Sequence, residues 1–297
     1  MVQMYSKTLD PSVLNDIYLN KCSIELQIKK ILSKNLVIEK ENYRKWLIKA
    51  VSLIDLTTLS GDDTRSNVTR LCLKAQKPLP NIDPNLKTAA VCVYPNRVID
   101  AYETLQRMGI TKEINIASVA TGFPSGLYPL ATRLQEIKFA VYSGANEIDV
   151  VLDRSLVLTG KWDVLYDEVL QMKKECGTAH LKVILGVGEL GTYENVYNAS
   201  MVAMMAGADF IKTSTGKEAV NATLPVGLVM CRAIRNFYQK TNKRVGLKPA
   251  GGIKTARDAV NWLVLVQSEL GPEWLCKELF RIGASSLLNV IEKELSQ

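Results

Sequence analysis

Histidine is almost absent from the sequence, since the 297 residues include only His180. Zinc hydrolases and zinc-dependent aldolases bind their metal through clustered histidines, so this chain cannot supply such a site. Pairs of histidine with a serine or cysteine nucleophile are disfavoured for the same reason. We expect His180 to have a surface or packing role and expect no metal and no cofactor. Chemistry would then come from Lys, Asp, Glu, Cys or Tyr side chains.

Long apolar runs and paired cysteines are absent as well. No stretch approaches the ~18 uninterrupted apolar residues of a membrane helix, and the N-terminal MVQMYSKTLDPSV has no apolar core of signal-peptide length. The cysteines are scattered, with no C-x-x-C pair: Cys22, Cys72, Cys92, Cys176, Cys231 and Cys276. This pattern is typical of free thiols in a reducing compartment. We therefore expect a cytoplasmic protein with no membrane partner.

Runs of like charge are missing too. The formal net charge is +7, but basic and acidic residues are interspersed, as in IEKENYRK (38–45), and no basic run of five or six occurs. Such a pattern supports a nucleic-acid-binding stripe only weakly. We expect no nucleic-acid partner and favour a small phosphorylated metabolite, which needs only a few local cations.

What the chain does contain is a repeating pattern of short β-rich runs. They are LIDLTTL (53–59), AVCVYP (90–95), INIASVA (114–120), EIDVVL (147–152), LKVILGVG (181–188), FIKTST (210–215), VGLKPAG (245–251) and LFRIGAS (279–285). Reference positions 55, 92, 118, 149, 182, 212, 248 and 282 are 37, 26, 31, 33, 30, 36 and 34 residues apart. Each step fits one strand, one helix and two loops.

The segments between these runs have helical periodicity. Leu130, Leu134, Ile137 and Val141 recur at steps of three and four before Gly144, and NVYNASMVAMMAGAD ends in the same way at its glycine. Eight strand–helix units predict an α/β fold, a (β/α)8 TIM barrel over residues 45–297, with an open doubly wound sheet as the alternative. Residues 1–44 have no strand signal and predict an N-terminal helical arm.

Charged residues inside the expected strands point to a site. We identify Asp55, Asp149, Lys182, Lys212 and Lys248, each on a different strand. Any one of them alone could be a strand-end residue in an ion pair. A barrel interior prefers Val, Ile and Leu, however, and barrel active sites lie at the carboxyl ends of the strands. Together the five residues predict convergence on one site.

Lysines and aspartates without histidine or metal fit Schiff-base chemistry. A lysine with a pKa of ~10.4 is neutral, and thus nucleophilic, in only about 10⁻³·⁴ of molecules at pH 7. Burial and a neighbouring ammonium both lower such a pKa. Lys212 and Lys248 on adjacent strands provide that neighbour. Asp149 and Asp55 would then hold the second cation and transfer protons.

A phosphate site is predicted beside these lysines. TSTGK (213–217) is not a P-loop, because Ile211 and Glu218 stand where that motif needs Gly and Ser or Thr. Lys217 beside Gly216 is instead a suitable phosphate contact. The glycines of PAGGI and the segment IGASS follow strands seven and eight, where barrels often bind phosphate through backbone N–H groups.

One segment supports a different function. GVGELG (186–191) matches G-x-G-x-x-G directly after a strand, with Asp209 about 20 residues further on. The alternative is therefore an NAD-dependent oxidoreductase. Against it, Glu189 would lie close to a pyrophosphate, and the motif is in the middle of the chain. A third alternative is a barrel that binds a sugar phosphate without catalysis.

Several motifs in order resemble the deoxyribose-phosphate aldolase family, a class I aldolase family of barrel fold. The resemblance covers roughly residues 44–292. It depends on IDLTTLSGDDT, AAVCVYP, EIDVV, LKVIL with GEL, ADFIKTSTGK with VNAT, GLKPAGGI and RIGASSLL. It implies a lyase that reversibly cleaves 2-deoxy-D-ribose 5-phosphate to acetaldehyde and D-glyceraldehyde 3-phosphate, in deoxyribonucleoside catabolism. A homo-oligomer is compatible with it.

The resemblance also implies residue roles. Lys212 would form the Schiff base, Lys248 would lower its pKa, Asp149 would be the general acid and base with an ordered water, and Asp55 would support them and the substrate hydroxyl. The residues expected to bind substrate are Cys92, Lys182, Thr215, Gly216, Lys217, Gly251, Gly252, Gly283, Ser285 and Ser286. Cys92 is not expected to be essential for catalysis.

Three departures from the family pattern are visible. Val187 precedes GEL where the family usually has threonine, which could alter packing behind Lys182. No tyrosine follows Tyr238, so the C-terminal tyrosine that some members use as a proton relay has no counterpart. The arm before the barrel is longer than in bacterial-type members, and its purpose is not predicted.

Overall fold

A computed structural model describes residues 8–14, 19–35 and 40–296. Residues 1–7, 15–18 and 36–39 of the predicted arm lie outside the described part of the chain, and the first seven include about half of the stretch MVQMYSKTLDPSV that argues against a signal peptide. Within the described ranges no helix is long and apolar enough to cross a membrane.

All eight predicted strands are present in the described residues. They are β1 (Ile54–Thr57), β2 (Ala90–Val93), β3 (Asn115–Ala120), β4 (Glu147–Val151), β5 (His180–Ile184), β6 (Phe210–Lys212), β7 (Gly246–Lys248) and β8 (Ile282–Ala284). Several are shorter than the run that predicted them. The run 181–188, for example, ends as a strand at Ile184, and Val187–Glu189 form a 3-10 helix, η3.

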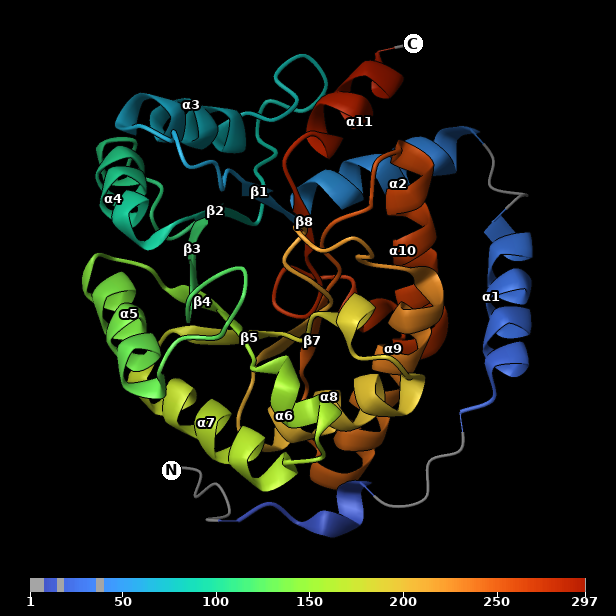
Figure 1. Ribbon diagram of the computed structural model, residues 1–297. Coiled ribbons are helices and arrows are strands. Elements are labelled where there is room, and N and C mark those ends of the chain that lie inside the picture. The colour runs from blue at the N-terminus through green and yellow to red at the C-terminus, as the bar shows by residue number, and fades with distance from the viewer. Residues whose placement is uncertain (1–7, 15–18, 36–39, 297) are drawn as a thin grey trace.

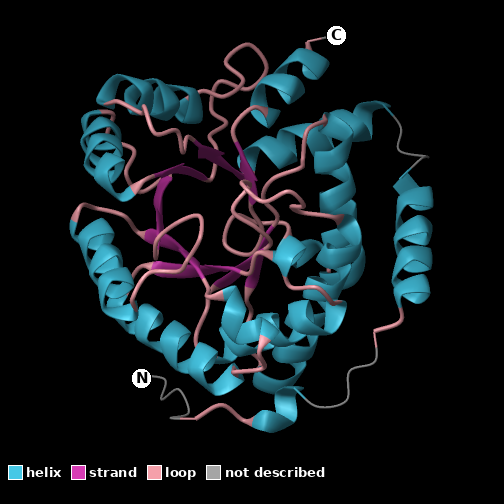
Figure 2. Cartoon of the chain, viewed as in Figure 1, coloured by secondary structure: helices cyan, strands magenta, loops and turns pink. Residues whose placement is uncertain are grey.

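The strands form a barrel. Their order in the sheet is β7-β6-β5-β4-β3-β2-β1-β8, and all seven pairings are parallel. Isolated bridges from Leu247 to Phe280 and from Ala250 to Gly283 join β7 to the β8 segment. Figure 2 shows the strands as a central ring inside the helices. The strand order has no reversal, so the (β/α)8 prediction is confirmed and the doubly wound alternative is wrong.

Helices follow the strands and cover the barrel (Figure 1). They are α3 (Arg65–Gln76), α4 (Val98–Arg107), α5 (Leu130–Tyr142), α6 (Arg154–Leu158), α7 (Trp162–Glu175), α8 (Tyr193–Met205), α9 (Leu224–Thr241), α10 (Ala256–Leu270) and α11 (Leu287–Leu295), with 3-10 turns η2 (Pro95–Arg97) and η4 (Pro272–Trp274). The predicted helix-ending glycines have the expected backbone, with φ of +107° at Gly144 and +102° at Gly207.

Three elements precede the barrel: η1 (Pro11–Leu14), α1 (Lys21–Asn35) and α2 (Lys40–Ser52). Helix α1 buries Ile24, Ile28 and Ile31, spaced by four and three residues, and packs outside α9 and α10 (Figure 1). Tyr43 on α2 donates a hydrogen bond to Glu294 on α11. Helix α2 runs across residue 44, and the division of the chain at that position stays a prediction.

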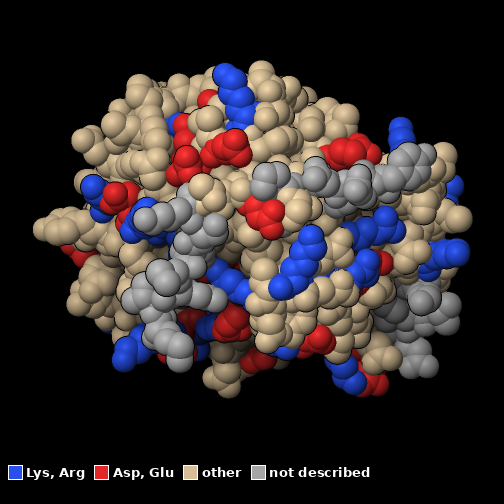
Figure 3. All heavy atoms as spheres, turned by 90° about the horizontal axis from the view of Figure 1, so that it is seen from below, with Lys and Arg blue, Asp and Glu red and all other residues tan. Residues whose placement is uncertain are grey.

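Apolar side chains fill most of the space between the strands and helices, as expected for a parallel sheet covered on its outer face. On the face shown in Figure 3, Lys and Arg side chains lie among Asp and Glu side chains. This view agrees with the interspersed charges of the sequence. Most of the buried charged side chains in the described residues lie together inside the barrel and define the site.

Candidate active site

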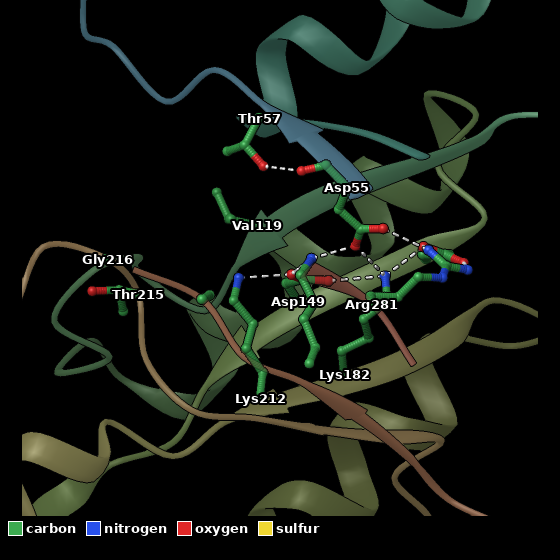
Figure 4. Close-up of polar contacts among 12 residues, drawn as sticks. Asp55, Thr57, Val119, Asp149, Lys182, Lys212, Thr215, Gly216 and Arg281 are labelled. Carbon is green, nitrogen blue, oxygen red and sulfur yellow. Dashed lines mark hydrogen bonds and ion pairs between the residues drawn. The ribbon is translucent and has the colours of Figure 1, made fainter. Parts of the chain in front are cut away.

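The five charged strand residues converge inside the barrel. Asp55, Asp149, Lys182, Lys212 and Lys248 are each at most 3% exposed. Figure 4 shows the side chains of Asp55, Asp149, Lys182 and Lys212 directed toward one another, and Lys248 contacts both aspartates. Parallel register explains the convergence, because Asp149 is paired with Lys182 and Lys212 with Lys248 on neighbouring strands. The five charged residues that the sequence singles out therefore form one cluster.

Two further members were missed. Glu147 is the first residue of β4 and Arg281 immediately precedes β8, and each is 1% exposed. Arg281 donates to Glu147 Oε1 at 2.6 Å and to Asp55 Oδ1 at 2.7 Å. Both residues stand inside the runs EIDVVL and LFRIGAS. Counting charged residues at every position of those runs, including their first residues, would have found them.

The lysines differ in how many carboxylates they contact. Lys182 Nζ lies 2.5 Å from Glu147, 3.1 Å from Asp149 and 3.8 Å from Asp55. Lys248 Nζ lies 2.5 Å from Asp55 and 2.6 Å from Asp149. In contrast, Lys212 Nζ has one such contact, 2.8 Å from Asp149 Oδ2. The protonated form of Lys212 is therefore the least stabilised of the three.

Burial and charge move the pKa values of these lysines in opposite directions. Burial lowers the pKa of Lys212, and the Lys248 ammonium lowers it further against the opposing effect of Asp149. Burial would also lower the pKa of Lys248, but Asp149 and Asp55 together raise it above the ordinary value. Burial is likewise outweighed at Lys182, whose pKa Asp149 and Glu147 raise.

The carboxyl groups stay ionised for the complementary reason. Burial alone would raise the pKa of Asp149, but Lys182, Lys212 and Lys248 hold it well below its ordinary value. Burial is similarly outweighed at Asp55, chiefly by Lys248 and Arg281. A charged Asp149 surrounded by three amines can accept and return protons next to Lys212.

A cleft of about 470 Å³ opens beside Lys212 at the carboxyl ends of the strands. Eight predicted contacts, from β8 and from the loops after β6, β7 and β8, line it: Thr215, Gly216, Lys217, Gly251, Gly252, Gly283, Ser285 and Ser286. Thr57, the last residue of β1, and Thr58 and Leu59, which follow it, also line the cleft. Lys217 extends across the cleft, and its Nζ lies 3.3 Å from the Leu59 carbonyl oxygen.

Not every cleft N–H group is open to a ligand. The Glu218 carboxylate accepts hydrogen bonds from the backbone N–H groups of Thr215 and Gly216, at 3.0 and 3.1 Å. This contact fixes the loop that carries Lys217. An anion in the cleft would therefore depend on Lys217 and on the loops after β7 and β8.

Glycine is required where two of these loops approach each other. Gly251 has φ of +74°, and a Cβ there would lie 2.7 Å from Asn221 side-chain atoms. At Gly283 a Cβ would lie 2.9 Å from that of Ala250 and 3.3 Å from Cε of Lys248. Gly283 thus leaves the space through which the Lys248 side chain reaches Asp149.

Two predicted substrate-binding residues do not belong to this cleft. Among the described residues that line it, Lys182 and Cys92 are missing. Lys182 lies deeper, between carboxylates. Cys92 on β2 is 1% exposed and packs with Val119, Phe123 and other apolar residues, and burial raises the pKa of its thiol despite nearby Lys248. A substrate contact for either residue stays a prediction.

His180 lies at the first position of β5 and is half exposed, with Nδ1 4.0 Å from Glu147. A larger cleft, of about 800 Å³, lies between the loops after β1, β2 and β3 and helix α5. Its described lining residues include none of the charged cluster. Of these two clefts, the one beside Lys212 is therefore the one that joins the loops predicted to bind phosphate to the buried cluster.

The segment GVGELG does not form a dinucleotide site of the expected kind. It follows β5 as the 3-10 helix η3 rather than opening an α-helix. A Cβ at Gly188 would lie 2.1 Å from the Val220 carbonyl oxygen, so this glycine permits packing against a neighbouring loop. Nothing in the fold supports the oxidoreductase alternative.

Comparison with known proteins agrees with this geometry. The family model described as DeoC/LacD family aldolase matches residues 49–293. Deoxyribose-phosphate aldolases of Mus musculus and Homo sapiens are 57% and 56% identical to this chain, over 97% of it and 92% of each relative. A deoxyribose phosphate aldolase structure from Aeropyrum pernix, described as tetrameric, matches with a TM-score of 0.66 and 24% identity, over 87% of this chain and 99% of that one.

These matches span nearly the whole barrel and agree with the fold. The chain belongs to the DeoC/LacD family of aldolases.

Proposed function

We propose that this protein is a class I aldolase that reversibly cleaves 2-deoxy-D-ribose 5-phosphate to acetaldehyde and D-glyceraldehyde 3-phosphate. One observation carries the proposal: Lys212, whose charged form has a single carboxylate partner among the described residues, is also the one of the three buried strand lysines that lines the cleft. The names of the mouse and human relatives support the choice of substrate.

In the cleavage direction, neutral Nζ of Lys212 attacks the C1 aldehyde of the open-chain sugar. Loss of water gives a protonated Schiff base. Asp149, acting through an ordered water, takes the proton of the C3 hydroxyl. The C2–C3 bond then breaks, its electron pair forms the enamine, and D-glyceraldehyde 3-phosphate leaves. Protonation at C2 and hydrolysis release acetaldehyde and restore Lys212.

The other residues position these groups. Lys248 keeps its charge between Asp55 and Asp149 and disfavours a second ammonium at Lys212. Lys217 and the N–H groups near Gly251, Gly252, Ser285 and Ser286 would hold the 5-phosphate. The position of the phosphate rim relative to Lys212 would orient C1 toward the amine, which supplies part of the rate enhancement.

We also propose a cytoplasmic location, from the unpaired cysteines, and a role in deoxyribonucleoside catabolism, from the substrate. No finding favours the NAD-dependent alternative. The third alternative, a barrel that binds sugar phosphate without catalysis, makes a different prediction, because it would bind the substrate without releasing aldehydes.

The experiment is a coupled assay for D-glyceraldehyde 3-phosphate released from 2-deoxy-D-ribose 5-phosphate. We expect turnover by the wild-type protein and none above background by Lys212→Met. Lys138→Met, on the exposed face of α5, is the matched control and should retain full activity. Saturable substrate binding without turnover would support the non-catalytic alternative instead.

A further inference from the structure

The buried cluster has an uneven number of charges. It holds three carboxylates, Asp55, Glu147 and Asp149, and four basic groups, Lys182, Lys212, Lys248 and Arg281, all at most 3% exposed. With all seven ionised the cluster carries one excess positive charge. With Lys212 neutral it carries none. An unbalanced charge in a barrel interior is costly, so the balanced state is the favoured one.

Arg281 and Glu147 contribute to this balance from a distance. They stand at the amino ends of β8 and β4, whereas Lys212 is the last residue of β6. Neither lines the cleft beside Lys212. Arg281 contacts Asp55 and Glu147 on one side, and its guanidinium lies 5.5 Å from the Phe210 ring. It cannot touch a substrate in that cleft and can act only through other groups.

The contacts form one chain. Arg281 contacts Asp55, Asp55 contacts Lys248, and Lys248 contacts the Asp149 oxygen that Lys212 also contacts. Glu147, which Arg281 also contacts, provides a second route to Asp149, since it lies 2.5 Å from Lys182 and Lys182 contacts Asp149. A change of charge at Arg281 therefore reaches Lys212 without any movement of the cleft.

We propose that Arg281 is a positioning residue that, together with Glu147, fixes the charge of the cluster so that Lys212 is the amine left neutral. This inference rests on the proposed function, since it explains how the Schiff-base lysine is prepared. Arginine suits the role because its guanidinium keeps its proton at any ordinary pH and can contact two carboxylates at once.

Among the described residues, few titratable or charged groups surround Arg281 and Lys212. Arg281 contacts Asp55 on β1 and Glu147 on β4. Glu147 in turn lies near Lys182 and the half-exposed His180, both on β5. Asp149, Lys248 and the buried Cys92 surround Lys212. Because burial raises the pKa of the Cys92 thiol, that group stays neutral near pH 7 and does not enter the count.

Charge substitutions test the proposal. Arg281→Met removes one positive charge, and Glu147→Gln removes one negative charge. The double variant Arg281→Met with Glu147→Gln has Lys182 and Lys248 against Asp55 and Asp149, so it is balanced again with Lys212 neutral. Arg281→Lys keeps the charge but loses the two-carboxylate contact and serves as the matched control.

The readout is the rate at which acetaldehyde with cyanoborohydride labels Lys212, measured from pH 5 to pH 10 and located by peptide mapping. In Arg281→Met the midpoint of the profile should rise by on the order of one to two pH units, with labelling at pH 7 slowed by about tenfold or more. In Glu147→Gln it should fall. In the double variant and in Arg281→Lys it should lie within about half a unit of the wild-type value.

If Arg281 and Glu147 had a purely structural role, all variants would show a lower maximal labelling rate with the midpoint of the pH profile unchanged. That result would overturn the proposal. A double variant displaced as far as Arg281→Met would overturn it as well. If Arg281→Met does not fold, the proposal can still be tested with Glu147→Gln, the double variant and Arg281→Lys. An unmoved midpoint in Glu147→Gln would contradict the charge balance. Failure of the proposed function would instead appear in the wild-type protein, as no label on Lys212 at any pH.

Discussion

Lys212 and Lys248 donate hydrogen bonds to the same oxygen atom, Oδ2 of Asp149, at 2.8 Å and 2.6 Å. One carboxylate oxygen cannot fully compensate two ammonium groups in a buried site. Lys248 has Asp55 as a second partner, and Lys212 does not. The geometry therefore distinguishes the two lysines and supports their proposed roles, with Lys248 as the retained cation and Lys212 as the nucleophile.

Removal of the nucleophile should abolish turnover without unfolding the protein. We expect Lys212→Met to lose on the order of 10³-fold or more in kcat, because the other described lysines that line the cleft, Lys217 and Lys254, lie in its loops and not in the buried cluster. Thermal unfolding should be little changed, since Asp149 keeps Lys182 and Lys248 as partners. Full activity in this variant would contradict a Schiff base at Lys212.

Removal of the second lysine should act through the first. In Lys248→Met the pKa of Lys212 should rise, so kcat/KM at pH 7 should fall by about 10- to 100-fold and recover partly at higher pH. The free energy of unfolding should fall by about 3 kcal/mol, because Asp55 and Asp149 lose a buried partner. Lys248→Arg, which keeps the charge, is the control. A pH profile unchanged in Lys248→Met would contradict the assigned role.

Lys217, on the rim of the cleft, should contribute to binding only when the substrate carries a phosphate. Lys217→Ala should raise KM for 2-deoxy-D-ribose 5-phosphate by about tenfold and change kcat only slightly, since one charge-assisted contact is lost. The unphosphorylated sugar, 2-deoxy-D-ribose, should be cleaved equally well by variant and wild type. An equal loss with both sugars would argue against a phosphate contact.

Two neighbouring glycines should respond differently to alanine. Gly251→Ala should weaken substrate binding and lower stability, because it combines φ of +74° with atoms 2.7 Å from the new Cβ. Gly252→Ala, with φ of +82° and its nearest contact at 3.4 Å, should cost only about 1–2 kcal/mol of backbone strain. Denaturant unfolding of both variants checks the order. A Gly251→Ala variant that is more stable than Gly252→Ala would contradict the close approach of this loop to Asn221.

Acid should destabilise the barrel through its buried carboxylates. The folded pKa values of Asp149, Asp55 and Glu147 lie below their ordinary values, because nearby cations outweigh the effect of burial. Their contribution to stability is therefore fully present above about pH 4–5 and is lost as pH falls through the lower folded values. The thermal unfolding temperature, measured between pH 7 and pH 2, should fall steeply below about pH 4. In Glu147→Gln this fall should be less steep.

The sequence predicted the barrel because its information is local and repeated. Each apolar run of strand length, each helix period and each ending glycine, such as Gly144, indicates the same unit without reference to the others. Strand ends were less accurate. Thr213 and Ser214 are β-branched or polar residues that extend the predicted sixth strand, but they form loop hydrogen bonds to Ala250 instead.

The site was predicted in part for a related reason. Lys212, Lys248 and Asp149 stand out because charged residues are rare inside buried strands. Arg281 also stands inside a predicted strand run, LFRIGAS, but its partner Asp55 lies 226 residues away in the chain, so the sequence does not show that the two meet. The contact of Glu218 with the loop N–H groups also depends on a backbone conformation that the letters TSTGKE do not specify.

The central claim is that Lys212 attacks a carbonyl as a neutral amine near neutral pH. The most direct measurement is whole-protein and peptide mass spectrometry after treatment with acetaldehyde and borohydride at pH 7. The account predicts one reduced two-carbon adduct per chain, on Lys212, formed at stoichiometric yield and blocked by prior reaction with 2-deoxy-D-ribose 5-phosphate and borohydride. An adduct on Lys248 instead, or none at Lys212, would contradict it.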